Sequence, residues 1–209
     1  MSRYQLPEGD DGEFEPGSGR RVLKNHLHIA NSHKIEELET LAYESAIRDS
    51  ILHLDSKQGF TRDFIRDLHR NWLGGIYPFA GELRVVNVSK GFVTFCPAAN
   101  LPAQFQAFED DILSRYTPCD SRRGMDLAYA LAVVHVEFIL VHPFREGNGR
   151  LGRWLATLMA LQAGHPFLDF SLETTEVGRK RYFAALRRGF LRDLAPAVNL
   201  FGEILKRSS

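Results

Sequence analysis

The chain has 209 residues, 44% of them hydrophobic and 25% charged, and its acidic and basic side chains balance to a formal net charge of zero. This length and composition fit one globular domain with at most a short extension. The zero balance gives no bulk-charge attraction to nucleic acid or to a membrane, so we expect neither as a partner. The two cysteines, Cys96 and Cys119, are too few for a disulfide framework and lack metal-binding spacing.

The first stretch, residues 1–22, is rich in Gly, Pro, Asp and Glu. This composition predicts an N-terminal arm, extended or disordered, and the stretch lacks the apolar core of a signal peptide. The apolar run Leu127–Val141 is shorter than a membrane span and contains His135 and Glu137. We therefore expect a reduced, cytoplasmic protein, with delivery into another cell left open at this stage.

Two helices are predicted in the first part of the chain. The first covers 34–54, after a candidate N-cap at Asn31-Ser32, with apolar residues at helical spacing. The second is capped by Thr61, carries an apolar stripe on one face and ends at the glycine pair 74–75.

Residues 77–97 break the helical pattern. Val85–Val88 and Phe92–Phe95 are rich in β-branched and aromatic residues, and Lys90-Gly91 can form the turn between them. This pattern predicts a small hairpin. Because a lone two-stranded hairpin is marginally stable in water, it must pack against the helices.

Helices dominate the rest of the chain. Their predicted ranges are 101–115, 125–141, 149–164, 173–193 and 195–206. Gly164 is expected to end the predicted helix 149–164, with Pro166 just beyond it. The predicted fold class is therefore mainly α, a compact helical bundle with one small β-hairpin.

The segment Val141–Arg153 reads VHPFREGNGRLGR and lies between two of these helices. Pro143 disfavours helix at the residue before it, so the preceding helix should stop near Val141. Gly147 and Gly149 allow a left-handed backbone and the close approach of a ligand. The segment therefore predicts a loop that leads into a helix N-terminus, where unpaired N–H groups and the helix dipole form an anion site.

Charged side chains surround this predicted anion site. Arg150 and Arg153 are three residues apart and share one face of the first helical turn, where planar guanidinium groups suit phosphate oxygens. Glu146 can hold a Mg²⁺ ion that bridges phosphates. His142 is the one nearby side chain suited to act as a base at neutral pH. The segment predicts a site for nucleotide phosphates, a metal and a proton acceptor.

The residues from His142 to Arg153, HPFREGNGRLGR, resemble the signature of the Fic (filamentation induced by cAMP) family, HPFx(D/E)GN(G/K)RxxR, and match it at every position. The resemblance covers 23–193, which it implies is a Fic domain, and leaves 194–209 as a C-terminal helix. It implies transfer of AMP from ATP to a Tyr, Thr or Ser hydroxyl of a target protein, with release of pyrophosphate.

The resemblance also implies a role for the acid–base and metal-binding positions of the motif. His142 would be the base that deprotonates the target hydroxyl. Glu146 would be the Mg²⁺ ligand. Phe144 would point inward and anchor the loop, without a part in the chemistry.

The remaining motif residues would bind the triphosphate. By the resemblance, Gly147, Asn148 and Gly149 cradle the α- and β-phosphates. Arg150 would hold the β-phosphate region, and Arg153 the γ-phosphate. Phosphoryl chemistry depends mostly on positioning and charge neutralisation, so the grip on the γ-phosphate would orient the α-phosphorus for in-line attack.

The predicted hairpin resembles the Fic flap, which implies that a target protein docks there by adding a strand to it. Lys90 and Gly91 would contact the nucleotide or the target, or form a plain turn. Tyr182 and Phe183 lie where the family places contacts to adenine, although an aromatic pair on a helix also fits a core role.

Other functions and modes of regulation stay open at this point. The same site could transfer another phosphate-containing group, such as UMP, phosphocholine or phosphate, or the chain could be a nucleotide-binding interaction module without transferase activity. Intact reactive positions disfavour the module, and Gly149, where Doc-like kinases have Lys, favours AMP transfer together with Arg153. The stretch Thr40–Ser45 approaches the inhibitory motif (S/T)xxxE(G/N) of many Fic proteins but ends in the wrong residue. We therefore hypothesise that any inhibitor is a separate, antitoxin-like chain.

Overall fold

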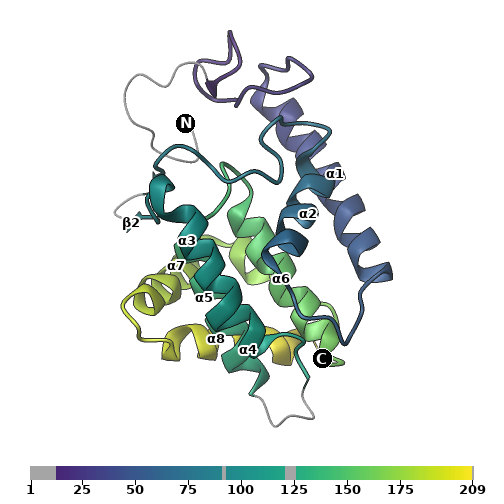
Figure 1. Ribbon diagram of the computed structural model, residues 1–209, viewed down its shortest axis with the longest axis vertical. Helices are drawn as coiled ribbons and strands as arrows, with labels where there is room; N and C mark the ends of the chain where they lie inside the picture. Colours follow the sequence, from purple (N-terminus) through teal and green to yellow (C-terminus); the bar gives the residue numbers. More distant parts are fainter. Residues whose placement is uncertain (1–12, 91–92, 121–125, 209) are drawn as a thin grey trace. The chain divides into compact units, whose positions relative to one another are not determined.

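The computed structural model describes residues 13–90, 93–120 and 126–208, and helices make up most of these ranges (Figure 1). The predicted fold class, mainly α with a small hairpin, is confirmed. No helix within these ranges is long and apolar enough to cross a membrane. Backbone contacts divide the chain into two compact units. The described residues of the first are 13–53, 62–90, 93–105 and 142–148, and those of the second are 54–61, 106–120, 126–141 and 149–208.

In the first unit, the two predicted helices are present as α1 (Ser32–Leu52) and α2 (Arg62–Leu73). The predicted cap of α1 is confirmed, because the Asn31 side chain accepts a hydrogen bond from the Lys34 N–H at 3.0 Å. Such a cap satisfies one of the N–H groups that the first helical turn leaves unpaired. Only Ile35 and Glu39 are fully buried among the residues of α1.

Glu39 joins α1 to the segment that contains α2. Its carbonyl accepts a hydrogen bond from the Trp72 indole N–H at 2.9 Å, and its carboxylate accepts one from the Tyr77 hydroxyl at 2.7 Å. A buried carboxylate is costly unless it is hydrogen-bonded, so these contacts account for an acidic side chain that is 3% exposed. They fix α2, whose inner face carries the buried residues Ile65, Leu68, His69, Trp72 and Leu73.

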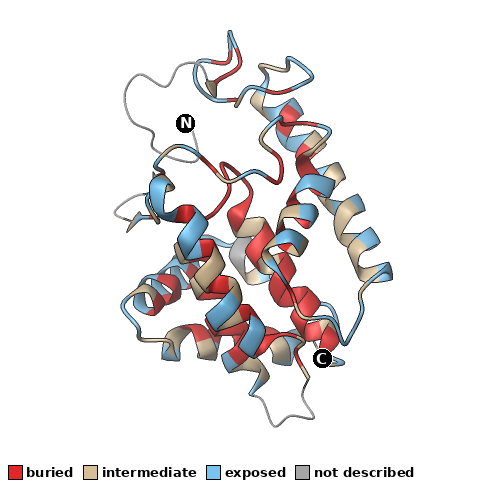
Figure 2. Ribbon diagram, in the orientation of Figure 1, coloured by how far each residue is buried: buried red, intermediate tan, exposed pale blue. Residues whose placement is uncertain are grey.

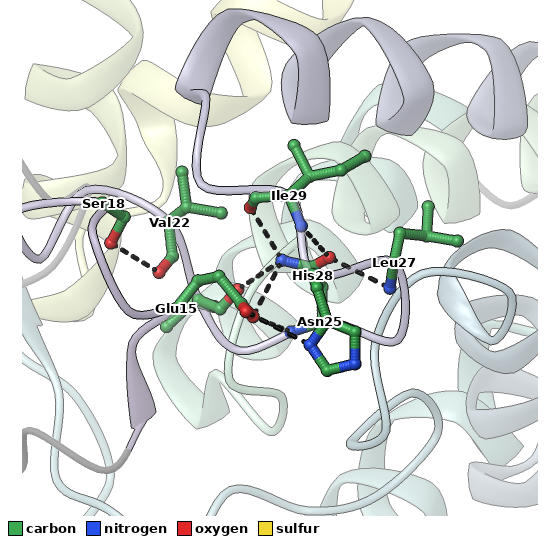
Figure 3. Close-up of polar contacts among 8 residues, drawn as sticks. Glu15, Ser18, Val22, Asn25, Leu27, His28 and Ile29 are labelled. Atoms are coloured by element: carbon green, nitrogen blue, oxygen red, sulfur yellow. Dashed lines mark hydrogen bonds and ion pairs between the residues drawn. The ribbon is translucent and has the colours of Figure 1, made fainter.

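Residues 13–31, which include the described end of the predicted arm, fold back on themselves. Phe14 and Leu23 form an isolated antiparallel bridge. Figure 3 shows the polar contacts between Glu15 and Asn25, in which the buried Glu15 carboxylate accepts hydrogen bonds from the main-chain N–H of Asn25 at 3.1 Å and from its side-chain amide at 3.4 Å. The amide oxygen of Asn25 accepts two further main-chain N–H groups at 3.0 and 3.2 Å, so one side chain organises the turn.

The hairpin is shorter than predicted and lies further along the chain. Strands β1 (Ser89–Lys90) and β2 (Val93–Thr94) pair antiparallel, with Ser89 opposite Thr94 and Lys90 opposite Val93. The predicted first strand, Val85–Val88, is wrong, and Lys90 lies in a strand instead of the turn. Gly91 and Phe92 lie outside the described residues.

Side chains explain why Val85–Val88 is not a strand. The Arg84 guanidinium donates to the Val86 carbonyl at 2.7 Å, and the Asn87 side-chain oxygen accepts from the Ala98 N–H at 2.8 Å. The first bond occupies the Val86 carbonyl, which then needs no strand partner. The second joins the Asn87 side chain to the segment that follows the hairpin.

The predicted helix over 101–115 has the expected extent but not uniform geometry. It consists of α3 (Leu101–Ala107), a π-helical segment (Phe108–Leu113) and α4 (Ser114–Tyr116). Phe108 and Leu113 of the π segment are buried. Apolar spacing alone does not distinguish this geometry from an α-helix, because a single wide turn shifts the pattern by only one residue.

In the described ranges, the second unit contains four longer α-helices after α4. They are α5 (Leu127–Val141), α6 (Asn148–Gln162, from its second residue), α7 (Glu176–Phe190) and α8 (Ala195–Ser208). Helix α5 is buried on almost all sides, and Figure 2 shows buried residues along most of α6. A short 3₁₀ turn, Ser171–Thr174, precedes α7, whose cap is Thr175.

The predicted stop of α6 is confirmed. Gly164 has a φ of +81°, and the main-chain N–H of His165 donates to the Ala160 carbonyl at 2.9 Å. Left-handed glycine is the usual way to end a helix, because its missing Cβ removes the steric penalty. No other heavy atom lies within 4 Å of where a Cβ at Gly164 would be.

Candidate active site

The motif divides between the units immediately after Asn148. Residues 142–148 belong to the first unit, and from Gly149 the chain continues through α6 in the second. The predicted end of the preceding helix before Pro143 is confirmed, since α5 ends at Val141. Each part of the motif is held by contacts within its own unit.

His142 has an unusual backbone and a covered side chain. Its φ is +51°, a left-handed value that is uncommon for residues other than glycine, and the residue is 4% exposed. Its imidazole stacks on the Phe95 ring, with centroids 3.7 Å apart and planes 14° apart. Its carbonyl accepts a hydrogen bond from Arg84 Nε at 2.8 Å, and the Pro143 carbonyl accepts one from the Arg84 main-chain N–H at 2.9 Å.

Glu146 is held through its main chain by a histidine of α2. The Gly81 N–H donates to Nδ1 of His69 at 2.8 Å, so the proton of the neutral imidazole lies on Nε2. Nε2 then donates to the Glu146 carbonyl at 3.0 Å, and the same ring stacks on Phe144 with centroids 4.0 Å apart. Phe144 is fully buried, as predicted for the anchor of the loop.

Asn148 closes the loop with its side chain. Its Oδ1 accepts from the Phe144 N–H at 3.0 Å, and its Nδ2 donates to the Phe144 carbonyl at 2.7 Å. One residue earlier, the Gly147 N–H donates to Oε1 of Glu146 at 2.9 Å. Because the Asn148 amide is used inside the loop, its contribution to a ligand would come from its main chain.

Arg145 ties the loop to the N-terminal segment. Its guanidinium Nε forms a short ion pair with the Glu13 carboxylate, and the side chain of Arg145 is 5% exposed. Glu13 is held in turn by its carbonyl, which accepts from the Lys24 N–H at 2.8 Å. The folded part of the arm therefore supports the motif loop.

In the second unit, α6 presents the two motif arginines at its start. Arg150 and Arg153 are both partly exposed. A Cβ built at Gly149 would lie 4.0 Å from Nη1 of Arg153, so this guanidinium extends back toward the first residues of the helix. The helix N-terminus carries a partial positive charge, and a neighbouring guanidinium adds to it.

The other predicted site residues have different settings. Tyr182 on α7 is buried, and its hydroxyl lies 2.6 Å from Nε2 of His135, so it belongs to the core of the second unit. Phe183 is 40% exposed, with its ring 5.4 Å from that of Tyr182. Lys90 is exposed in β1. Gly91 lies outside the described residues.

Two side chains that support the motif, Arg84 and His69, were given no role by the sequence reasoning. Arg84 is the last residue of YPFAGELR, Tyr77–Arg84, a stretch that resembles the lead-in to the Fic flap, and this resemblance was the signal available for it. His69 interrupts the apolar face of α2. A buried polar side chain on such a face indicates a specific hydrogen-bonding role.

The basic side chains of α7 are mostly paired. Lys180 contacts Glu176 at 2.6 Å on the same helix, and Arg181 forms a two-pronged ion pair with Glu203 of α8. Arg188 contacts Asp193, and Arg192, which lies just beyond the end of α7, contacts Glu137. Paired, exposed charges favour a solvated face over a docking surface for an acidic partner.

Gly147 offers a test of how tightly the loop is packed. Its φ is +86°, and an added Cβ would lie 2.7 Å from Cζ3 of Trp72. We expect Gly147→Ala to lower the free energy of unfolding by about 1–2 kcal/mol from backbone strain and by roughly 1–3 kcal/mol more from the clash. Urea denaturation measures this loss.

Gly164→Ala is the matched control, because Gly164 has a similar φ of +81° but open space around its Cβ position. Gly164→Ala should lower the free energy of unfolding only by the contribution from backbone strain. Equal losses for the two variants would show that the packing against Trp72 does not restrain the loop.

His135 predicts a loss of stability in acid. Burial lowers the pKa of this histidine from 6.5 to about 4, an effect to which the charge of Arg153 adds. As the pH falls below 6.5, His135 binds a proton in the unfolded chain but not in the folded chain. The free energy of unfolding therefore falls between pH 6.5 and about pH 4. The expected contribution to this loss is about 3 kcal/mol.

Urea denaturation across this pH range, on the wild type and on His135→Gln, measures that contribution. The variant lacks the titrating group and should lose correspondingly less stability on acidification. Identical pH dependence in the two proteins would contradict the prediction.

Comparison with known proteins agrees with the resemblance of the motif to the Fic signature. The model of the Fic/DOC family matches residues 59–160. The probable protein adenylyltransferase y4lH of Sinorhizobium fredii is 28% identical, over 94% of this chain and 95% of its own length. Protein adenylyltransferase fic-1 of Caenorhabditis elegans is 31% identical over 87% of this chain, which spans 35% of that protein.

Solved structures share the fold. The BepC protein of Bartonella tribocorum, crystallised with bound AMPPNP, matches with a TM-score of 0.73 at 20% identity, over 92% of this chain and 95% of that one. A fragment of Fic-1 from C. elegans matches with a TM-score of 0.66 at 28% identity, over 83% of this chain and 49% of the fragment. The chain is therefore similar to the Fic/DOC family over residues 59–160, and relatives named protein adenylyltransferases match it over most of its length.

Proposed function

We propose that the chain is a protein adenylyltransferase that transfers AMP from ATP to a Tyr, Thr or Ser hydroxyl of a target protein. The observation that carries the proposal is the complete motif. Its loop contains His142 and is hydrogen-bonded by Arg84 and His69. Arg150 and Arg153 lie on the first turns of the helix that follows. Relatives that cover nearly the whole chain are named probable protein adenylyltransferases.

In this reaction, the His142 imidazole accepts the proton of the target hydroxyl. The hydroxyl oxygen then forms a bond to the α-phosphorus of ATP, and the bond from that phosphorus to the bridging oxygen of the β-phosphate breaks. Pyrophosphate leaves with the electron pair of that bond. General-base catalysis of this kind typically contributes about 10²–10⁴-fold to the rate.

The start of α6 is the proposed triphosphate site. Gly147, Asn148 and Gly149 are the proposed contacts to the α- and β-phosphates, because a helix N-terminus attracts anions. In the structure, the Gly147 N–H donates to Oε1 of Glu146. Arg150 would bind the β-phosphate region and Arg153 the γ-phosphate. The direction of the Arg153 side chain toward Gly149 supports this assignment.

Glu146 is the proposed ligand of a Mg²⁺ ion. No group of three or more His, Cys, Asp or Glu side chains among the described residues could hold a metal ion. A lone carboxylate still fits Mg²⁺, because this ion commonly takes one or two protein carboxylates and completes its shell with water and substrate phosphates. When bound, the ion would neutralise charge on the phosphates.

The hairpin is the proposed docking place for the target. Strands β1 and β2 pair only with each other among the described residues, so a further strand can add at an edge. Main-chain bonds would then supply affinity with little demand on target sequence. Lys90, exposed in β1, is a candidate contact to the target or the nucleotide, and Phe183 is the more accessible of the two candidate adenine contacts.

Labelled ATP tests the proposed reaction. The protein is incubated with a cell lysate and ATP labelled at either the α- or the γ-phosphate, and the lysate proteins are separated. We expect label on protein from the α-position only. Transfer of γ-label would instead identify a kinase, and labelling from UTP or CDP-choline in place of ATP would identify UMP or phosphocholine transfer.

Regulation by a separate inhibitor chain remains part of the proposal. Glu44, which would be the glutamate of an internal inhibitory motif, is exposed on α1, and Ser45 stands where that motif needs Gly or Asn. Purification of the chain together with the products of neighbouring genes tests this. A lone protein that is fully active and well tolerated on expression would contradict it.

A further inference from the structure

Arg84 is a buried arginine whose hydrogen bonds go to main-chain carbonyls in two separate segments. Its Nε donates to the His142 carbonyl at 2.8 Å, and its main-chain N–H donates to the Pro143 carbonyl at 2.9 Å. Its Nη1 and Nη2 donate to the carbonyls of Val86 and Cys96, on the two sides of the hairpin. The residue is 4% exposed, and its bond to the His142 carbonyl is buried.

The two segments that Arg84 joins also touch through their side chains. Phe95, the residue before Cys96, stacks on the imidazole of His142 with ring centroids 3.7 Å apart. The Phe95 N–H in turn donates to the Val88 carbonyl across the hairpin at 3.4 Å. The His142 imidazole is therefore packed against the Phe95 ring. The main-chain carbonyl of His142 is bonded to Arg84, which also bonds carbonyls on both sides of the hairpin.

His142 needs such a restraint. A left-handed backbone costs a residue other than glycine roughly 1–2 kcal/mol, so the conformation persists only if its surroundings hold it. Two adjacent carbonyls bonded to one arginine fix the peptide plane that follows His142. Without them, the backbone could relax toward a negative φ and carry the imidazole with it.

We propose that Arg84 is a positioning residue for the catalytic base, which it holds in register with the hairpin that receives the target. This inference rests on the proposed function for its catalytic meaning, although the placement of His142 can be measured without a reaction. The planar fork of arginine is essential to the role, because its donors reach three carbonyls in different directions. A lysine offers one ammonium group and cannot reach all of them.

Arg84→Lys tests the proposal, because it preserves the charge and removes the fork. We expect the rate of AMP transfer to lysate proteins at saturating ATP to fall on the order of 10²-fold, the effect of a small misplacement of a reacting group. The apparent Kd for ATP should stay unchanged, because these hydrogen bonds of Arg84 go to the carbonyls of His142, Pro143, Val86 and Cys96, which are not proposed phosphate-binding residues. Arg70→Lys is the matched control, since Arg70 in the same unit pairs with the exposed carboxylates of Asp67 and Glu82.

NMR of protein labelled at histidine supplies a readout that a general structural role would not move. The ring current of Phe95 should shift the His142 imidazole signal, and Phe95→Leu assigns this shift. In Arg84→Lys, we expect the His142 signal to move toward that of an unstacked histidine, while the His69 and His135 signals stay in place. The Arg70→Lys control should leave all three unchanged.

An unchanged His142 signal in Arg84→Lys would overturn the proposal, whatever the transfer rate, and so would equal displacement of all three histidine signals. If Arg84→Lys does not fold, Arg84→Gln keeps one amide donor without a buried charge and is judged by the same signals. If the wild type transfers no AMP, the proposed function fails, but the NMR comparison still decides whether Arg84 positions His142.

Discussion

Replacing His142 with alanine is expected to abolish detectable AMP transfer while ATP binding persists. The imidazole is the proposed acceptor of the target's proton, and loss of a general base typically lowers the rate about 10²–10⁴-fold. The proposed triphosphate contacts come from other residues, at the start of α6, so the nucleotide should still bind. Transfer of α-label measures the first effect, and isothermal titration with ATP measures the second.

His33→Ala provides the matched control, because His33 is an exposed histidine at the start of α1. It should transfer AMP at the wild-type rate. Because His142 stacks on Phe95, its replacement also leaves space in the first unit, so His142→Asn is compared alongside as a smaller change. Near-wild-type transfer by both His142 variants would exclude this histidine as the base.

Arg153→Ala is expected to lower AMP transfer by about 10²–10³-fold, equivalent to roughly 3–4 kcal/mol of transition-state stabilisation. Its guanidinium extends toward Gly149 at the start of α6, where the γ-phosphate is proposed to bind. Without this grip, ATP could bind in a pose that does not present the α-phosphorus. The rate at saturating ATP should therefore fall more than the affinity for ATP.

The matched control is Arg187→Ala, which removes the same charge from an exposed position on α7. Arg153→Lys separates charge from geometry, since lysine keeps the charge but loses the planar fork that binds two phosphate oxygens. If Arg153→Ala transfers AMP as fast as Arg187→Ala, the assignment of Arg153 to the γ-phosphate is wrong.

Local signals in the sequence predicted the elements around the motif. Pro143 placed the end of α5, Gly164 placed the end of α6, and Asn31 placed the start of α1. Each of these residues acts through its own backbone or through a neighbour a few residues away. Such effects can be read without knowledge of the tertiary structure.

The supports of the motif loop could not be predicted in this way. Arg84 reaches a carbonyl 58 residues further along the chain, and His69 reaches one 77 residues further along. Nothing in the local pattern specifies such partners. Arg84 also helps to explain the misplaced hairpin, because it bonds the Val86 carbonyl within the stretch that β-propensity assigned to a strand.

Mass spectrometry of a protein labelled by this enzyme tests the central claim most directly. After incubation with ATP, the labelled target is digested, and the modified peptide is fragmented to identify the adduct and its position. We predict an AMP group in a phosphodiester to the hydroxyl of Tyr, Thr or Ser, absent when His142→Ala replaces the wild type. A bare phosphate, a different phosphate-containing group, or an AMP adduct that His142→Ala forms equally well would contradict the account.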